Sequence, residues 1–183
     1  VLKEGQLFLL DAGAENTMHY AGDLTSTMPV SGRFTERQKM VYDINLRAYR
    51  TAVAALRPGI TYREVHMMAV TEICKGMKEL GLLKGDPAEA ANVGAYALFM
   101  PHGLGHNMGL DVHEMEDLGQ IYVGYDDETR PSTQCGLASL RMGRRLHPGH
   151  VLTVEPGCYF IPALIDQWEA EGTCKEFINF DAL

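Results

Sequence analysis

Residues 102–114, HGLGHNMGLDVHE, contain three of the seven histidines in the chain together with three glycines. His102 and His106 have the i, i+4 spacing that is typical of zinc ligands on a helix, and His113 follows further along. A helix is nevertheless disfavoured here, because each glycine costs roughly 1 kcal/mol relative to alanine, and the helical zinc motif HExxH is absent. The segment is therefore expected to be irregular or extended, with glycines that let the backbone approach another group closely.

Three acids lie at or near the ends of apolar runs. Asp11 ends LFLLDAG, Asp23 follows in MHYAGDLT, and Glu155 ends VLTVEPG. A hairpin would bring Asp11 and Asp23 together, where their charges repel unless a cation lies between them. Carboxylates with imidazole and no thiolate favour Mn²⁺, Fe²⁺, Co²⁺ or Zn²⁺, and paired acids would allow two ions. An acid at a strand end is more often a turn residue, and an isolated histidine is more often structural, so spacing alone leaves both interpretations open.

Two long helices are expected to support these side chains. Residues 34–59 and 61–81 have apolar positions at helical spacing, and each segment ends at glycine. Each expected helix begins with a capping box, in which a threonine side chain and a residue three positions later satisfy each other's backbone amides. The two boxes are Thr35 with Gln38 and Thr61 with Glu64.

Strands are expected on either side of the helices. Residues 6–14 predict a buried strand, residues 18–25 its hairpin partner, and residues 149–160 a later strand that Pro156 and Gly157 interrupt. A strand pair, then two long helices, then further strands is typical of a mixed α+β domain and not of regular βαβ alternation.

The composition is that of one globular domain with a sizeable core: 183 residues, 46% hydrophobic and 22% charged. A net charge of −8 argues against a nucleic-acid or anionic-membrane surface. No apolar run is long enough for a bilayer and no signal peptide is recognisable, so a cytoplasmic location is expected. The cysteines show no metal or redox spacing and are interpreted as buried or incidental thiols; they are Cys74, Cys135, Cys158 and Cys174.

The ordered motifs DAG…GDLTSTMPVSGRF, HGLGHNMGLDVHE and LTVEPGCY resemble the pita-bread-fold metallopeptidases, specifically the branch of Xaa-Pro aminopeptidases and prolidases. The resemblance runs over essentially the whole chain. It implies a pita-bread fold, with a mixed and largely antiparallel sheet covered by helices. Methionine aminopeptidases share the acid pair but have a different histidine motif, which places that branch second.

The resemblance also implies a set of metal ligands. Asp11 would bind one metal ion, Asp23 would bridge two, and His106 would be the imidazole ligand. Glu155 would bind metal and move the proton of the attacking water. The cofactor implied is a pair of divalent ions, Mn²⁺ first, with Co²⁺ or Zn²⁺ as alternatives.

His102 and His113 match family histidines that are not ligands but contact the substrate and stabilise the tetrahedral intermediate. The reaction implied is hydrolysis of the Xaa-Pro bond at the N-terminus of a peptide with proline at its second position. A dipeptide substrate, as in prolidase, is the alternative. The expected partner is this peptide, with a homo-oligomer as a further expectation and no nucleic acid or membrane.

The sequence departs from the family pattern in two respects. Ser26 stands where the family often has arginine, and the Gly-x-Arg-x-Glu-Asp pattern of the family's last strand, with its second bridging glutamate, does not occur. The family's N-terminal domain is also missing from the sequence. Residues 1–183 are therefore expected to be a catalytic pita-bread domain, incomplete at the C-terminus, that is weak or inactive alone. Of the remaining alternatives, a creatinase-like hydrolase without metal would lack the acids, whereas a non-catalytic interaction domain stays open.

Overall fold

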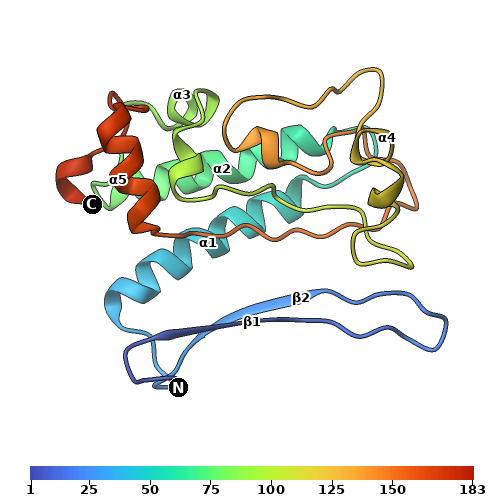
Figure 1. Cartoon of the computed structure of the whole chain (residues 1–183), viewed down its shortest axis with the longest axis horizontal. Coiled ribbons are helices and arrows are strands. Elements are labelled where there is room, and N and C mark those ends of the chain that lie inside the picture. Colours follow the sequence, from blue (N-terminus) through green and yellow to red (C-terminus); the bar gives the residue numbers. More distant parts are fainter.

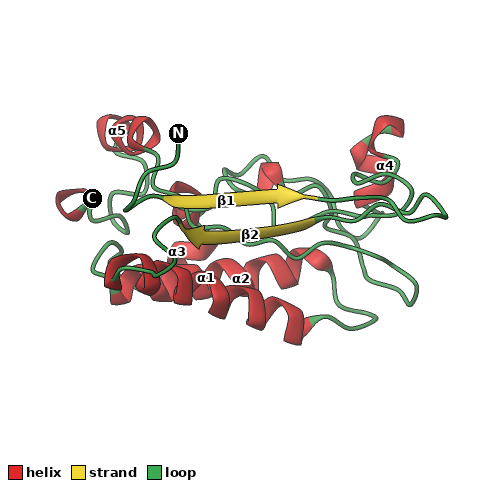
Figure 2. Ribbon diagram, turned by 90° about the horizontal axis from the view of Figure 1, so that it is seen from below, coloured by secondary structure: helices red, strands yellow, loops and turns green.

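The computed structural model describes residues 1–183 and divides them into a hairpin and a body (Figure 1). The hairpin consists of β1 (Leu7–Ala12) and β2 (Leu24–Pro29), and the body is built on the long helices α1 (Glu36–Ala55) and α2 (Tyr62–Glu79). Shorter elements complete the body: α3 (Pro87–Asn92), η1 (Ala95–Leu98), η2 (Glu116–Leu118), α4 (Gln120–Gly124), η3 (Leu137–Ser139), α5 (Pro162–Glu171) and η4 (Phe180–Ala182). The hairpin and the two long helices form separate layers, with α4 and α5 at opposite ends of the molecule (Figure 2).

Both predicted helices are confirmed, including their capping boxes. The Thr35 side chain accepts a hydrogen bond from the backbone of Gln38, and Thr61 does the same with Glu64. The predicted inner face of α1 is also largely correct, since the buried side chains of this helix are Ile44, Ala48 and Ala52. Met40 was predicted on that face, but it is half exposed, since the buried part of α1 begins one turn later at Ile44.

The core lies between α2 and the segments that surround it. Residues Val65, Ala69 and Ile73 of α2 are fully buried, as their spacing predicts, within a cluster of 27 buried residues. At the α1–α2 contact, a Cβ on Gly76 would lie 2.5 Å from the side chain of Ile44, so glycine is required for this close approach. None of the helices is both long and apolar enough to cross a membrane.

The hairpin is antiparallel, from Leu7 opposite Pro29 to Ala12 opposite Leu24. The prediction placed the second strand at residues 18–25 and was wrong in position. A local turn occupies this region instead, because the side chain of Asn16 accepts hydrogen bonds from the backbone of Met18 and Tyr20.

Two extended segments lie side by side in the body, residues 104–108 and 151–155. Three backbone hydrogen bonds join them in antiparallel order: Met108 N to Val151 O, Thr153 N to His106 O and Glu155 N to Leu104 O. The predicted late strand is therefore extended as expected, although the only β-bridge it makes joins Leu152 to Asn107. This pairing brings the segment containing Glu155 against the histidine segment.

Helix α5 was not anticipated from the sequence. Pro162 occupies its first turn, where a missing amide proton does no harm, and Gly172 ends it with φ of 67°. Both are recognisable boundary signals, but the short segment between them lacks a clear amphipathic pattern.

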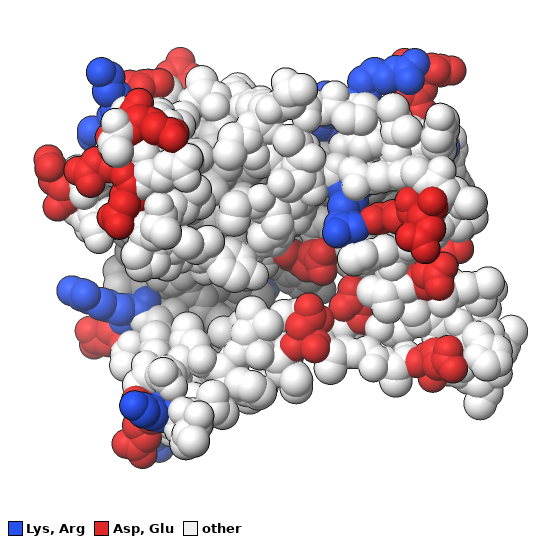
Figure 3. All heavy atoms as spheres, in the orientation of Figure 1, with Lys and Arg blue, Asp and Glu red and all other residues white.

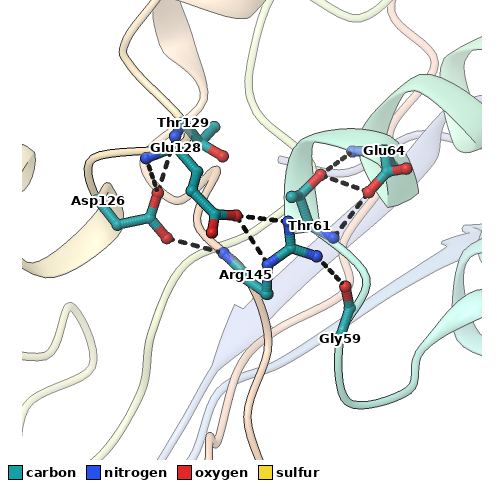
Figure 4. Close-up of polar contacts among 7 residues, drawn as sticks. All are labelled: Gly59, Thr61, Glu64, Asp126, Glu128, Thr129 and Arg145. Atoms are coloured by element: carbon teal, nitrogen blue, oxygen red, sulfur yellow. Dashed lines mark hydrogen bonds and ion pairs between the residues drawn. The ribbon is translucent and has the colours of Figure 1, made fainter.

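The start of α2 is held by a polar network (Figure 4). Arg145 donates to Glu128 at 2.5 and 2.9 Å and also contacts the Gly59 carbonyl. Asp126 accepts from the backbone of Arg145 at 3.2 Å. The amide of Tyr62, the first residue of α2, also donates to the carbonyl of Arg144 at 2.9 Å, so the start of α2 is tied to residues 144 and 145.

His66 is a fully buried polar residue of α2. Its Nε2 lies 2.9 Å from the hydroxyl of Tyr96, and its Nδ1 has no hydrogen-bond partner. Burial is the main cause that lowers the pKa of His66 to about 3, with smaller contributions from His102 and Arg63.

We predict that His66 makes the fold sensitive to acid. Because its pKa is near 6.5 in the unfolded chain and about 3 in the folded chain, the unfolded state binds the proton first as pH falls. The free energy of unfolding should therefore fall by about 1.4 kcal/mol per pH unit between these two values, and His66→Leu should lack this component. Urea denaturation from pH 7.5 to 4 measures both, with the exposed His19→Gln as control. Parallel curves for wild type and His66→Leu would contradict the prediction.

Candidate metal centre

Three predicted ligands converge from three different segments: Asp23 just before β2, His106 from the histidine segment and Glu155 from the segment beside it. One ligand atom of each lies within 4.8 Å of the others. His106 Nε2 is 3.3 Å from Asp23 Oδ2 and 3.7 Å from Glu155 Oε1. The side chains of His106 and Asp23 are only 3% and 13% exposed, so their charges are poorly screened by water.

The tautomer of His106 follows from its second nitrogen. Nδ1 lies 2.9 Å from the carbonyl oxygen of Asn107. A carbonyl oxygen can only accept, so Nδ1 carries a proton and Nε2 is the nitrogen that faces the two carboxylates. Three electron-rich atoms at these distances repel one another unless a cation or a proton lies between them. Oxygen and nitrogen donors without thiolate, with the histidine oriented from behind, fit a divalent metal ion.

Asp11 lies near this group but outside it. It is exposed at the end of β1, opposite Thr25, and lines the same cleft of about 600 Å³ as Asp23, His106 and Glu155. Acidic side chains gather along the hollow between the hairpin and the body (Figure 3). From this position Asp11 could reach a second ion in the cleft, and its role as a metal ligand stays a prediction.

Burial is the main cause that raises the pKa of Glu155, and the nearby charges of Asp23 and Asp11 raise it further. His106 and Arg141 act in the opposite direction. A glutamate in these surroundings holds a proton more readily than an exposed one. Such a group is suited to accept and release a proton during a reaction.

Backbone contacts place Asp23 in front of His106. The amide of Ala21 donates to the carbonyl of Gly109 at 2.8 Å, which ties the hairpin to the histidine segment. On the other strand, a Cβ added to Gly13 would overlap the carbonyl of Gly22. The glycine in Asp-Ala-Gly is therefore needed for the segments that follow β1 and precede β2 to approach each other beside Asp11 and Asp23.

His113 packs edge-on against His106, with ring centroids 4.3 Å apart. Arg141 Nη1 lies 3.3 Å from His113 Nδ1 and is also paired with Glu116. Because arginine can only donate, His113 Nδ1 accepts and its other nitrogen, Nε2, carries the proton. Burial first, and then Arg141 and His106, lower the pKa of His113 and keep it neutral. Sequence reasoning missed Arg141 and Glu116, because nothing in the spacing of a polar loop links them to His113.

His102 is placed differently from His113. Its Nδ1 donates to the carbonyl of Gly103 at 2.7 Å, and its buried Nε2 has no partner. The ring packs edge-on against Tyr159, 5.5 Å away, and a Cβ on Gly157 would lie 2.9 Å from Nε2. His102 is not among the residues that line the cleft, so its contact with a substrate stays a prediction.

Comparison with known proteins identifies the family. Residues 1–176 match the model of metallopeptidase family M24. The chain belongs to this family. It is 41% identical over its whole length to the Xaa-Pro dipeptidase of Mus musculus, and 38% identical over 98% of its length to a probable Xaa-Pro aminopeptidase of Botryotinia fuckeliana. The chain spans only 35% and 37% of these two relatives, respectively.

Solved structures of the family have the same fold. Zinc-substituted Escherichia coli aminopeptidase P in complex with product matches with a TM-score of 0.71 and 40% identity. Proline aminopeptidase P II from Yersinia pestis matches with a TM-score of 0.71 and 42% identity. Each match covers 88% of this chain and 32% of the solved one. The predicted family and its pita-bread fold are confirmed.

We predict that the chain binds divalent metal ions through His106. A ligand at a free concentration of 100 times its dissociation constant stabilises the folded state by about 2.7 kcal/mol. Mn²⁺, Co²⁺ or Zn²⁺ should therefore raise the melting temperature of the chain, and a chelator should reverse the rise. His106→Gln should remove the effect, because it replaces the imidazole at the centre of the group. His19→Gln, the same change at an exposed histidine of the hairpin loop, should retain it. Equal metal-induced shifts in the two variants, measured by differential scanning fluorimetry, would exclude His106 as a ligand.

Proposed function

We propose that this chain carries the hydrolytic centre of a metal-dependent Xaa-Pro peptidase. The observation that supports it best is the convergence of Asp23 and Glu155 on Nε2 of His106. Membership of family M24 and the similarity to Xaa-Pro dipeptidases and aminopeptidases support the type of substrate.

The proposed cofactor is a pair of divalent ions, with Mn²⁺ as the native metal. Asp23, His106 and Glu155 would hold them, together with Asp11, and Asp23 would contribute to both. Such ions lower the pKa of water and polarise a carbonyl group, which is the chemistry that peptide hydrolysis needs. Oxygen-rich donor sets suit Mn²⁺, whereas Co²⁺ and Zn²⁺ remain compatible with the imidazole.

The protein side chains would handle the protons and the substrate. Glu155, whose pKa is raised by burial and by Asp23, would accept the proton of the attacking water and pass it to the leaving proline nitrogen. His113 would donate from Nε2 to the oxygen that becomes negative in the tetrahedral intermediate. Arg141 supports this role by holding His113 at Nδ1. We assign His102 a contact with the substrate.

An aminopeptidase that releases the residue before proline is the preferred form of this activity. The hollow between the hairpin and the body continues along the hairpin beyond the acidic cluster, which leaves room for residues after the proline (Figure 3). An Xaa-Pro dipeptidase is the alternative with the same chemistry. A non-catalytic interaction domain is less favoured, since such a domain has no need of a buried imidazole nitrogen aimed at two carboxylates.

We predict slow hydrolysis of Xaa-Pro peptides by the metal-loaded chain. Release of the first residue from Ala-Pro-Ala and from Ala-Pro can be followed by mass spectrometry, with and without Mn²⁺. Glu155→Gln should lower the rate at least about 100-fold, because general acid–base catalysis contributes factors of this size. Glu114→Gln, the same change at an acid of the histidine segment outside the ligand group, should leave a measurable rate.

The two peptides also separate the two forms of the activity. Faster cleavage of Ala-Pro-Ala supports the aminopeptidase, and cleavage of Ala-Pro alone supports the dipeptidase. Cleavage of Ala-Ala-Ala at an equal rate would contradict specificity for proline. Tight metal binding without turnover of any Xaa-Pro peptide would contradict a catalytic role for this chain.

A further inference from the structure

The contact between His106 and Thr153 departs from an ordinary antiparallel pair. In such a pair, two opposite residues exchange two backbone hydrogen bonds. Here the amide of Thr153 donates to the carbonyl of His106 at 3.0 Å. The return bond goes to a side chain instead, since the amide of His106 donates to Thr153 Oγ1 at 3.0 Å. The hydroxyl of Thr153 thus replaces its own carbonyl as the partner of His106.

The displaced carbonyl has another partner. Thr153 O accepts a hydrogen bond of 2.5 Å from the hydroxyl of Tyr62, the fully buried first residue of α2. Glycine at position 105 leaves room for this arrangement, because a Cβ there would lie 2.6 Å from Tyr62 Oη and 2.7 Å from Thr153 Oγ1. Tyr62 is itself fixed, as its amide donates to the carbonyl of Arg144 at 2.9 Å, beside the network at the start of α2 (Figure 4).

The hydrogen bond from the His106 amide to the Thr153 hydroxyl lies between two candidate metal ligands, His106 and Glu155. Thr153 is opposite His106 and two residues before Glu155, whose amide is bonded to Leu104 O at 2.8 Å. Because the Thr153 carbonyl turns toward Tyr62, the second hydrogen bond between the two segments at this point is made to a hydroxyl and not to a backbone carbonyl. The side chains of His106 and Glu155 start from these two segments, so their separation depends on this link.

We propose that Thr153 is a positioning residue of the metal centre, with Tyr62 as its support. The hydroxyl of Thr153 sets the spacing of the histidine segment against the Glu155 segment, and so brings His106 Nε2 to 3.7 Å from Glu155. The inference rests on the proposed function only in taking His106 and Glu155 as metal ligands. Groups that orient ligands from behind commonly change metal affinity by 10- to 100-fold when removed.

Two substitutions of similar size test the hydroxyl. Thr153→Val keeps the shape and removes the hydroxyl, so the buried amide of His106 must either stay unpaired or move to the Thr153 carbonyl and displace Tyr62. Thr153→Ser keeps the hydroxyl and removes only a methyl group. Titration calorimetry with Mn²⁺ should show affinity at least about tenfold weaker for Thr153→Val and near that of wild type for Thr153→Ser.

A second measurement needs no metal. The imidazole nitrogen shifts of His106 and the exchange rate of its amide proton, both from nuclear magnetic resonance of the metal-free chain, should change in Thr153→Val and be restored in Thr153→Ser. A general loss of stability would not give this rescue at one residue. Folded Thr153→Val with wild-type shifts, amide exchange and affinity would overturn the proposal.

Two further outcomes are informative. If Thr153→Val does not fold, Tyr62→Phe provides a second test, because it removes only the supporting hydroxyl. Tyr62→Phe should still weaken Mn²⁺ binding and shift the His106 signals. Wild-type Mn²⁺ affinity and wild-type His106 signals in this variant would overturn the proposal. Should wild type bind no metal at all, the proposed function fails, while the His106 signals of the metal-free variants still decide whether Thr153 positions this residue.

Discussion

The imidazole nitrogen of His106 can lie among carboxylates only where a positive charge offsets them, and much of the surrounding structure serves to hold this arrangement. Asn107 fixes the proton on the far side of the ring, and Asp23 arrives on a hairpin that closes through Gly13 and Gly22. Burial of His106 strengthens every charge interaction at Nε2. A cation held at this point would offset the charges of Asp23 and Glu155, which suits these three side chains as a ligand set.

The body supplies rigidity where the centre needs it. Helix α2 is buried along one face and fixed at its start by a capping box and by Arg145. Its first residue, Tyr62, reaches the segment that carries Glu155. The hydroxyl of Tyr62 therefore links the buried start of α2 to the segment that carries a candidate ligand, although Tyr62 does not itself line the cleft.

Much of this could be predicted from the sequence because the signals were local. The capping boxes at Thr35 and Thr61 predicted both helices, and acids at the ends of apolar runs predicted two of the three residues that converge, Asp23 and Glu155. The missed features depend on contacts between distant segments. Nothing near position 141 indicates that Arg141 would reach His113, and a local turn at Asn16 moved the second strand of the hairpin. His102 likewise packs against Tyr159, a contact between distant positions that its spacing in the histidine segment does not reveal.

The hairpin contributes no residue to the hydrophobic core, and the exposed side chains of β1 and β2 make few contacts with the body. Its links to the body are polar: the bond from Ala21 to Gly109, the bond from Gln38 to Gly5 and the approach of Asp23 to His106. An ion held by Asp23 and His106 would therefore act as a cross-link between the most loosely and the most tightly held parts of the chain. The order of the hairpin then becomes a function of metal concentration, so that the same ion that equips the site for chemistry also completes the tertiary structure around it.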